Sequence, residues 1–215
     1  MSEARTVAVI GAGKVGTALA GALSGAGHRV VLAAPDRPSE GIARALAAHP
    51  GLTAAPAPDA VGAADAVLLC TPFAANADAL APVAGALAGR VLVDCTNPVG
   101  PGLRHGLDSV RAGAEQVAGL AAGARVVKAF SVYGVEVLAG PRALGTAPAP
   151  MMPLAGDDPD AVALVAGLAA DMGWDPLPVG PLAQALHLEH MTLLWVRMVR
   201  AGGHPPLLAW AALGG

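Results

Sequence analysis

Short apolar runs alternate with longer Ala- and Leu-rich stretches along most of the chain. The runs predict buried strands, because their apolar content is nearly continuous and turn residues bound them. They cover residues 6–10, 29–33, 66–69, 91–94, 125–130, 152–155 and 175–178. The longer stretches predict helices over residues 15–24, 39–48, 76–88, 109–121 and 159–172. Apolar strands separated by helices are typical of a parallel sheet covered on both faces, so we expect a doubly wound α/β fold.

The last part of the chain has a different pattern. Residues 181–201 predict one longer helix, which Gly202–Gly203 would end. On this helix His187, Met191, Leu194 and Met198 share one face at helical spacing. We therefore expect an α/β domain over residues 1–180 and a C-terminal helical segment over 181–215. The likeliest irregular connection is residues 141–150, which are rich in Pro, Ala and Gly.

A glycine-rich loop follows the first predicted strand and opens the first helix. Gly11, Gly13 and Gly16 have the spacing G-x-G-x-x-G, which in this context is typical of a dinucleotide-binding Rossmann fold. The first glycine permits the turn, the second lets the backbone approach a pyrophosphate, and the third lets helix and strand pack closely. A turn without a ligand is the alternative. We predict that the pyrophosphate is bound by Gly11, Ala12, Gly13, Lys14, Val15 and Gly16.

The end of the second strand bears on the choice of dinucleotide. An acid at that point would bind the ribose 2′-hydroxyl of NAD, but the sequence has Ala34 there. Arg37 could pair with the 2′-phosphate of NADP, whereas Asp36 could reach the 2′-hydroxyl of NAD. The sequence favours NADP and leaves NAD open.

Polar and aromatic residues follow three later strands. In such sheets the ligand lies beyond the carboxyl ends of the strands. We therefore expect the nicotinamide half of the cofactor to be bordered by Thr71, Pro72, Phe73, Asn97, Pro98 and Ser131.

The segments "VIGAGKVG", "DCTNP" and "VVKAF", with the region from "LAGDDPD" to "HLEHM", resemble the coenzyme F420-dependent NADP oxidoreductase family of small Rossmann proteins. The resemblance covers nearly the whole chain and extends to the reductase domain of the STEAP metalloreductases. It implies a dimeric reductase in which hydride passes between NADP(H) and a second acceptor, coenzyme F420 in the deazaflavin members. Family members commonly have "GSR" where this chain has Ala33–Pro35, and Asn where it has Ser131.

Two residues near the expected nicotinamide site could handle protons. Tyr133 is a tentative catalytic residue that could donate a proton to the acceptor, or it could simply pack at the rim. Lys128 could be an acid with a shifted pKa, or it could pair with an acid such as Asp94, and we favour the pairing.

Other candidate residues have simpler interpretations. His187 and His190 lack a third ligand at a useful spacing, so we predict no metal site, although either could line the acceptor pocket. Cys95 has no base nearby in the sequence and is expected to pack rather than react. Met191, Leu194, Trp195 and Met198 are expected to form a dimer core, so residues 181–215 would serve both dimerisation and the acceptor pocket.

Composition and charge narrow the setting. The 215 residues are 54% hydrophobic and only 13% charged, so we expect a buried interface in a homodimer. The net charge is −3 and no basic run is present, which argues against a nucleic-acid partner. We recognise neither a signal peptide nor an apolar stretch of membrane-spanning length, and therefore expect a cytoplasmic protein with no membrane partner.

Three functions stay open at this point. The first is an NADP-dependent oxidoreductase with coenzyme F420 as acceptor. The second is an NAD(P)H-dependent reductase of a C=N, C=C or C=O bond in a small metabolite, with Tyr133 or a histidine as proton donor. The third is a dinucleotide-binding sensor without catalysis.

Overall fold

A sheet of eight strands organises the computed structural model, which describes residues 3–36, 38–140, 145 and 148–213. The strand order is β10-β9-β8-β5-β4-β1-β2-β3. The strands are β1 (Thr6–Ile10), β2 (Arg29–Ala34), β3 (Thr53–Pro56), β4 (Ala66–Leu69), β5 (Val91–Asp94), β8 (Arg125–Lys128), β9 (Met151–Gly156) and β10 (Asp175–Gly180). Strands β1, β4 and β5 lie in the middle of the sheet and are almost wholly buried, as near-continuous apolar strands should be.

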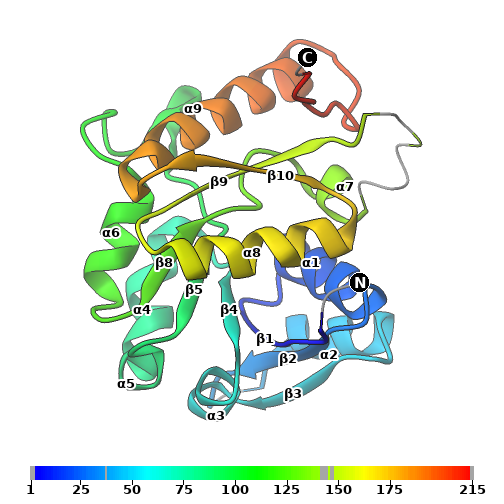
Figure 1. Ribbon diagram of the computed structural model, residues 1–215, viewed down its shortest axis with the longest axis vertical. Helices are drawn as coiled ribbons and strands as arrows, with labels where there is room; N and C mark the ends of the chain where they lie inside the picture. The colour runs from blue at the N-terminus through cyan, green and yellow to red at the C-terminus, as the bar shows by residue number, and fades with distance from the viewer. Residues whose placement is uncertain (1–2, 37, 141–144, 146–147, 214–215) are drawn as a thin grey trace.

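Helices connect and cover these strands (Figure 1). They are α1 (Lys14–Gly25), α2 (Glu40–Ala48), α3 (Ala57–Gly62), α4 (Asn76–Leu80), α5 (Ala84–Leu87), α6 (Gly113–Leu120), α7 (Val135–Leu138), α8 (Pro159–Met172) and α9 (Ala185–Val196). A π-helical turn, Arg197–Ala201, continues α9. A small hairpin of β6 (Val99–Gly100) and β7 (Arg104–His105) follows β5. Short 3₁₀ turns occur at Phe73–Ala75, Ala81–Val83, Pro101–Leu103 and Leu182–Gln184.

The doubly wound α/β fold is confirmed, with one correction to the sheet. Strand β9 runs antiparallel to β8, whereas an all-parallel sheet was expected. In Figure 1 helix α7, which follows β8, does not run back along the sheet as a crossover helix would. The chain therefore enters β9 from the end of the sheet at which it left β8, and must run the other way. Helix α8 then makes a full crossover, so β10 is parallel to β9.

Two predicted helices differ from those observed. The stretch 76–88 is divided into α4, a 3₁₀ turn and α5, because Pro82 cannot donate the backbone hydrogen bond of a helix interior. The helix predicted from residue 109 begins at Gly113, since Asp108 and Ser109 have φ angles of 50° and 59°. Edge strand β3 was not predicted, because its four residues are short and mostly exposed and include a proline.

The C-terminal helix forms as predicted and ends at Gly202. It packs against α6 and β9 of the same chain, beside the sheet at the top of Figure 1. Trp195 is 2% exposed, and its indole N–H donates to the carbonyl of Leu208 at 2.7 Å. This corrects its assignment to a dimer core, since Trp195 is already buried within its own chain. On the same helix Leu194 is 50% exposed and is open to a partner.

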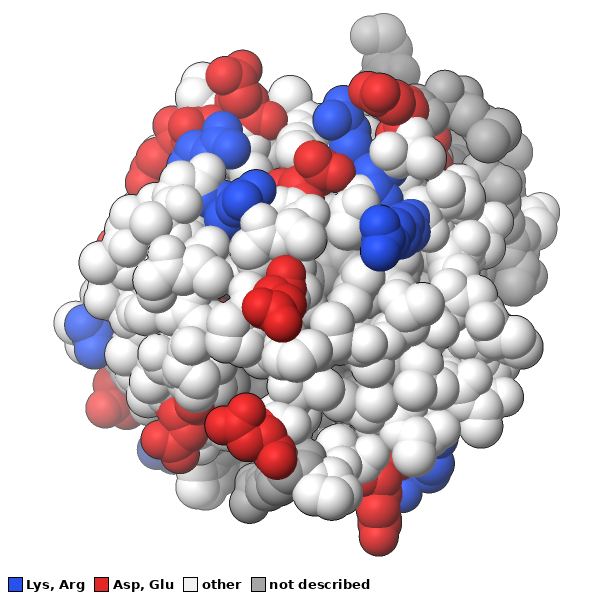
Figure 2. All heavy atoms as spheres, turned by 90° about the horizontal axis from the view of Figure 1, so that it is seen from below, with Lys and Arg blue, Asp and Glu red and all other residues white. Residues whose placement is uncertain are grey.

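Charged side chains are scattered on the surface. On the face in Figure 2, acidic and basic residues are separated by wide uncharged areas. Within the part of the chain that the structure describes, no helix is both long enough and apolar enough to cross a membrane.

Candidate dinucleotide and acceptor site

The glycine loop joins β1 to α1 at the carboxyl end of the sheet. Gly11 has a φ of 99°, and a Cβ on it would lie 2.9 Å from the carbonyl carbon of Cys70. A Cβ on Gly16 would lie 1.9 Å from the carbonyl oxygen of Gly11. Neither position can hold a larger residue without moving backbone, so these two glycines serve the turn and the close packing of α1 against the loop.

Gly13 differs from Gly11 and Gly16, because nothing in the protein requires it to be glycine. Its φ of −78° suits any residue, and no atom lies within 4 Å of the point where its Cβ would be. Gly13 is also the N-cap of α1, whose first turn has no side-chain cap and no acidic residue. The first amide groups of α1 are thus free to meet an anion, and the space above Gly13 fits a pyrophosphate lying against the backbone.

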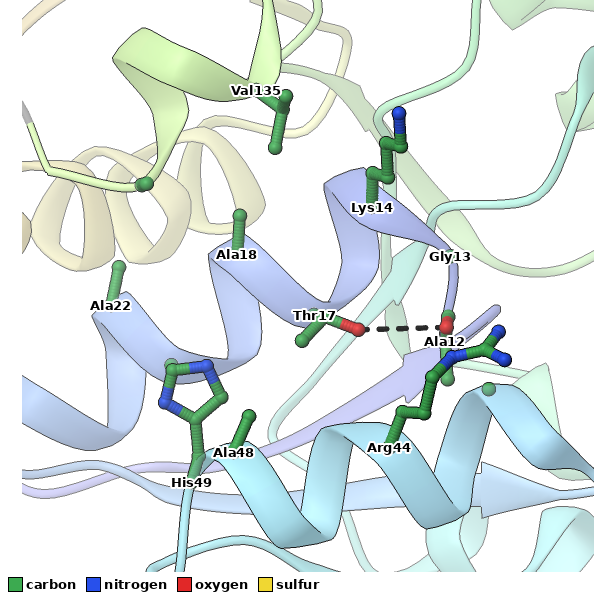
Figure 3. Close-up of a pocket in the computed structure, with 13 residues that line it drawn as sticks. Ala12, Gly13, Lys14, Thr17, Ala18, Ala22, Arg44, Ala48, His49 and Val135 are labelled. Carbon is green, nitrogen blue, oxygen red and sulfur yellow. Dashed lines mark hydrogen bonds between the residues drawn. The ribbon is translucent and has the colours of Figure 1, made fainter.

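A groove of about 800 Å³ runs from this loop along α1 (Figure 3). Helix α2 forms one wall and α7 another, and small side chains such as Ala18 and Ala22 line its floor. Lys14 and Arg44 stand at the end nearest the loop, where the Thr17 hydroxyl donates to the carbonyl of Ala12 at 3.5 Å. The loop end of the groove is therefore its more basic end.

The predicted 2′-phosphate residue Arg37 lies outside the described residues. The neighbouring end of β2 is described, and it presents Ala34 with no acidic side chain at that position. A cofactor with a 2′-phosphate would therefore meet no acidic side chain at Ala34. The role of Arg37 stays a prediction.

A chain of hydrogen bonds links the ends of β4 and β5. The Thr71 hydroxyl donates to Asn76 Oδ1 at 2.8 Å, and Asn76 Nδ2 donates to Thr96 Oγ1 at 3.1 Å. The Thr96 hydroxyl in turn donates to Asp94 Oδ1 at 2.6 Å. Asn76 is 2% exposed and was not among the predicted site residues, although the series fixes the loop that carries Thr71.

Predicted rim residues from β4 and β5 also meet. A Cβ on Gly113 would lie 2.7 Å from the ring of Phe73 and 3.1 Å from Pro98 Cδ, so both side chains converge on the start of α6. Asn97 Nδ2 donates to the carbonyl of Ser131 at 3.0 Å, which joins β5 to β8. The structure therefore brings together four of the six predicted rim residues through these contacts.

Thr192 of α9 holds the junction of Asn97 and Ser131 from above. Its hydroxyl lies 3.0 Å from Asn97 Oδ1 and 2.9 Å from the carbonyl oxygen of Ser131. The Asn97 amide thus keeps one N–H with no protein partner among the described contacts, and the buried Ser131 hydroxyl has none. The half-buried Asn97 amide is therefore available to a ligand at the carboxyl edge of the sheet, whereas the Ser131 hydroxyl is buried and not exposed to one.

A fully buried ionic cluster lies under this rim. Lys128 Nζ is 3.0 Å from Asp94 Oδ2 and 3.2 Å from Glu189 Oε1, and all three side chains are at most 1% exposed. Nζ also donates to the carbonyl of Thr96. Burial opposes the charge on Lys128, but the carboxylates of Asp94 and Glu189 outweigh it and hold the pKa of Lys128 above its ordinary value. The predicted pairing with Asp94 is confirmed.

Glu189 is the second acid of this cluster, and sequence reasoning missed its role. Its Oε2 accepts from the backbone N–H of Gly113 at 2.9 Å and from His105 Nε2 at 2.7 Å, and its Oε1 accepts from Ala114 at 3.2 Å. The carboxylate of α9 therefore caps the start of α6, where a negative charge is favoured. The one signal in the sequence is an acidic residue between two histidines on a largely apolar predicted helix.

The tautomer of His105 follows from its neighbours. Nδ1 accepts from the backbone N–H groups of Leu107 at 3.3 Å and Ser109 at 3.2 Å. A nitrogen that accepts carries no proton, so the proton is on Nε2 and is donated to Glu189. The His105 ring stacks on that of His190, with centroids 5.4 Å apart and planes at 6°.

Tyr133 is placed for packing more than for catalysis. Its hydroxyl donates to the carbonyl of Met151 at 2.7 Å and accepts from the backbone N–H of Trp210 at 3.3 Å. Its ring stacks on Trp174 with centroids 5.1 Å apart. Burial raises the pKa of Tyr133 far above its ordinary value. With its hydroxyl engaged by β9 and the C-terminal segment, its tentative assignment as a proton donor has no support in this geometry.

The two cysteines are free and buried, as the packing interpretation requires. Burial raises the pKa of the Cys95 thiol well above its ordinary value, and the adjacent Cys70 adds to the effect. A thiol of this kind is a poor nucleophile. His187 and His190 are both exposed on α9. Across the described ranges, no group of three His, Cys, Asp or Glu side chains is placed to hold a metal ion.

Comparisons with known proteins relate the chain to one family and to several solved structures. The family described as "NADP oxidoreductase coenzyme F420-dependent" matches residues 6–98. A crystal structure from Arthrobacter sp. FB24, described as an F420-dependent NADP-reductase, is 28% identical with a TM-score of 0.82, over 97% of this chain and 100% of that one. A hypothetical protein from Sinorhizobium meliloti is 31% identical with a TM-score of 0.75, over 84% and 87% of the two chains.

A curated relative is longer. Metalloreductase STEAP3 of Rattus norvegicus is 31% identical over 96% of this chain, which spans 40% of the length of that relative. Together the fold, the glycine loop and these matches define a Rossmann-type NAD(P)-dependent oxidoreductase. The chain belongs to the coenzyme F420-dependent NADP oxidoreductase family.

Proposed function

We propose that the protein is an NADP(H)-dependent reductase that exchanges a hydride with a second bound acceptor, and that coenzyme F420 is this acceptor. The observation that carries the proposal is the open space at Gly13, beside an uncapped helix start with no acid in its first turn. The family match supports F420, because the family and the Arthrobacter protein are both described by that coenzyme.

The choice of NADP over NAD is part of the proposal. Ala34 removes the acid that would bind the 2′-hydroxyl of NAD and would repel a 2′-phosphate. Lys14 and Arg44 place positive charge beside the glycine loop, and Arg37 follows β2 in the sequence. These groups support a cofactor that carries the additional phosphate.

The remaining chemistry is mainly orientation. When bound, nicotinamide supplies or accepts the hydride, and the protein needs little acid–base chemistry of its own. The spare N–H of Asn97 would hold the ring edge at the carboxyl end of β5. Thr192 and Ser131 would keep this amide in place, since the Thr192 hydroxyl contacts Asn97 Oδ1 and the Ser131 carbonyl accepts from Asn97 Nδ2.

A homodimer is also proposed, formed through the outer face of α9. Leu194 is 50% exposed there, and Met191 and Met198 lie at helical spacing from it. The low charge of the chain supports such an interface. The two free, buried thiols of Cys70 and Cys95 are consistent with our expectation of a cytoplasmic protein.

The proposal is tested by titrating purified protein with NADPH and NADH, and by following the absorbance of oxidised F420 in the presence of each. We expect NADPH to bind more tightly than NADH and to reduce F420. Replacing Gly13 by Val should lower NADPH affinity by about tenfold or more, since the side chain would fill the space left for pyrophosphate. The free energy of unfolding should fall by no more than about 1 kcal/mol, because the Cβ would meet no protein atom and valine is only a poorer N-cap than glycine.

The matched control is Gly119→Val, since Gly119 is exposed and also has no atom within 4 Å of its Cβ position. It should bind NADPH like the wild type. If Gly13→Val binds NADPH normally, the proposed cofactor site is wrong. If NADPH binds without reducing F420, the acceptor assignment fails, and small imines, enones and carbonyls should be tested next. Binding with no turnover on any of these would point to a sensor.

A further inference from the structure

A second cavity, of about 490 Å³, lies between the β6–β7 hairpin and α9. Its volume is within the range of pockets that hold small molecules. Both walls start at the nicotinamide rim: the hairpin follows Asn97 and Pro98 directly, and α9 carries Thr192, which contacts Asn97. On α9 and its π-helical continuation the cavity is lined by His190, Leu193 and Arg197, which share one face of the helix, whereas Thr192 lies on another face. The cavity therefore shares the hairpin and α9 with the rim, but it lies on a different side of α9 and does not include the glycine loop.

Backbone strain is concentrated at this cavity. Among the described residues, four that are not glycine have a positive φ, and three of them line it: Leu103 at 57°, Asp108 at 50° and Ser109 at 59°. Such conformations are unfavourable for residues other than glycine and persist only where the surroundings impose them. Here the surroundings include His105, whose Nδ1 holds the N–H of Ser109, and Arg197, whose guanidinium donates to the carbonyl of Leu103 at 3.0 Å. These hydrogen bonds hold the strained backbone, and with it the cavity, in one shape.

The lining combines positive charge with flat and apolar surface. Arg104 and Arg197 contribute guanidinium groups, and Asp108 is the one acid among the lining residues of the described chain. Arg104 is exposed, and no hydrogen bond or ion pair to any described residue engages its side chain. The imidazole of His190, stacked on that of His105, offers a flat surface, and Leu193 adds an apolar one.

We propose that this cavity binds a planar organic anion, whose ring lies against His190 and Leu193 and whose carboxylate or phosphate pairs with Arg104. A free guanidinium beside a flat apolar surface matches both parts of such a ligand. Binding of this anion does not rest on the proposed function, since no residue of the rim lines the cavity.

Binding is tested without nucleotide, by following the imidazole NMR signals of ¹⁵N-labelled protein during titration with 2-naphthoate and, in parallel, with neutral 2-naphthamide. We expect 2-naphthoate to shift the His190 signals and to bind more tightly than the amide. Arg104→Gln should weaken naphthoate binding about fivefold and leave naphthamide binding unchanged. Arg111→Gln is the matched control, because Arg111 is exposed in the segment between β7 and α6 but does not line the cavity.

Equal binding of acid and amide would overturn the proposal, as would equal losses in the two arginine variants or unmoved His190 signals. A separate NADPH titration distinguishes the two proposals. Protein that binds NADPH but not naphthoate contradicts only the anion site. Protein that binds naphthoate at Arg104 but does not bind NADPH contradicts the reductase and leaves the anion site standing.

Discussion

Replacing Glu189 by Gln should destabilise the protein far more than a change of one atom suggests. The carboxylate accepts from four donors: Lys128 Nζ, His105 Nε2 and the backbone N–H groups of Gly113 and Ala114. A glutamine amide has one accepting oxygen, and its nitrogen can only donate. In either orientation two of the four donors would face an NH₂ group, so two buried donors lose their acceptor.

The magnitude follows from these lost contacts. A buried donor without an acceptor costs about 1–3 kcal/mol, so the two together cost about 4 kcal/mol. The partner left behind is charged Lys128, and breaking a buried ion pair costs a similar amount, about 3–5 kcal/mol. In the variant, Lys128 Nζ still pairs with Asp94 Oδ2 at 3.0 Å. We therefore expect the loss in free energy of unfolding for Glu189→Gln to lie near the middle of these ranges.

Urea unfolding measures this loss. With a slope of about 3 kcal/mol per molar for a chain of this size, a loss of 4 kcal/mol lowers the midpoint by about 1.3 M. Glu136→Gln is the control, because it makes the same change in a carboxylate that pairs with Arg200 at the surface. Such exposed pairs contribute about 0–1 kcal/mol. If the two variants unfold at the same urea concentration, the reasoning about Glu189 is refuted.

Three further predictions concern single side chains. Tyr133→Phe should lower stability by about 1 kcal/mol through loss of the bond to Met151 and leave kcat unchanged, so a large fall in kcat at constant stability would restore Tyr133 as a proton donor. Burial lowers the pKa of His28, against the opposing effect of Asp171, so its neutral form is favoured on folding. Stability from His28 is then present above pH 6.5 and is lost as pH falls below it. His28→Phe should therefore reduce the fall in thermal stability below pH 6.5, and an unchanged slope there would count against this assignment. Cys95 should react with iodoacetamide in native protein only as fast as the chain opens, and rapid alkylation would contradict its buried, high-pKa state.

Much of the sheet could be predicted from the sequence, because its central strands are local apolar runs and the glycine loop is a local motif. The direction of β9 could not be, since it depends on α7 staying at one end of the sheet and not on the composition of β9. Helix α8 was predicted at its observed bounds, and its boundaries are also local: Asp158 caps one end and Gly173, with a φ of 98°, ends the other.

The candidate site, like the sheet, could be predicted only in part from the sequence. Asn97 and Ser131 were expected at one rim because parallel strands end at the same edge, and their hydrogen bond agrees with that argument. Glu189 and His105 are 84 residues apart, and no spacing in the sequence relates them. Their contact arises only when α9 packs on α6, so it could be found only in the folded chain.

The buried cluster explains why the C-terminal helix belongs to the site and is not an appendage. Glu189 fixes α9 to Lys128 at the end of β8 and to the start of α6. Thr192, one turn further along α9, holds Asn97 and the Ser131 carbonyl. Because the residues share one rigid helix, the ionic anchor sets the position of the rim contacts. Hence Glu189→Gln should displace the rim as well as lower stability. In protein that is still folded, kcat should fall because the nicotinamide ring is less well oriented, while the Kd for NADPH, set mainly at the glycine loop, should change less than kcat.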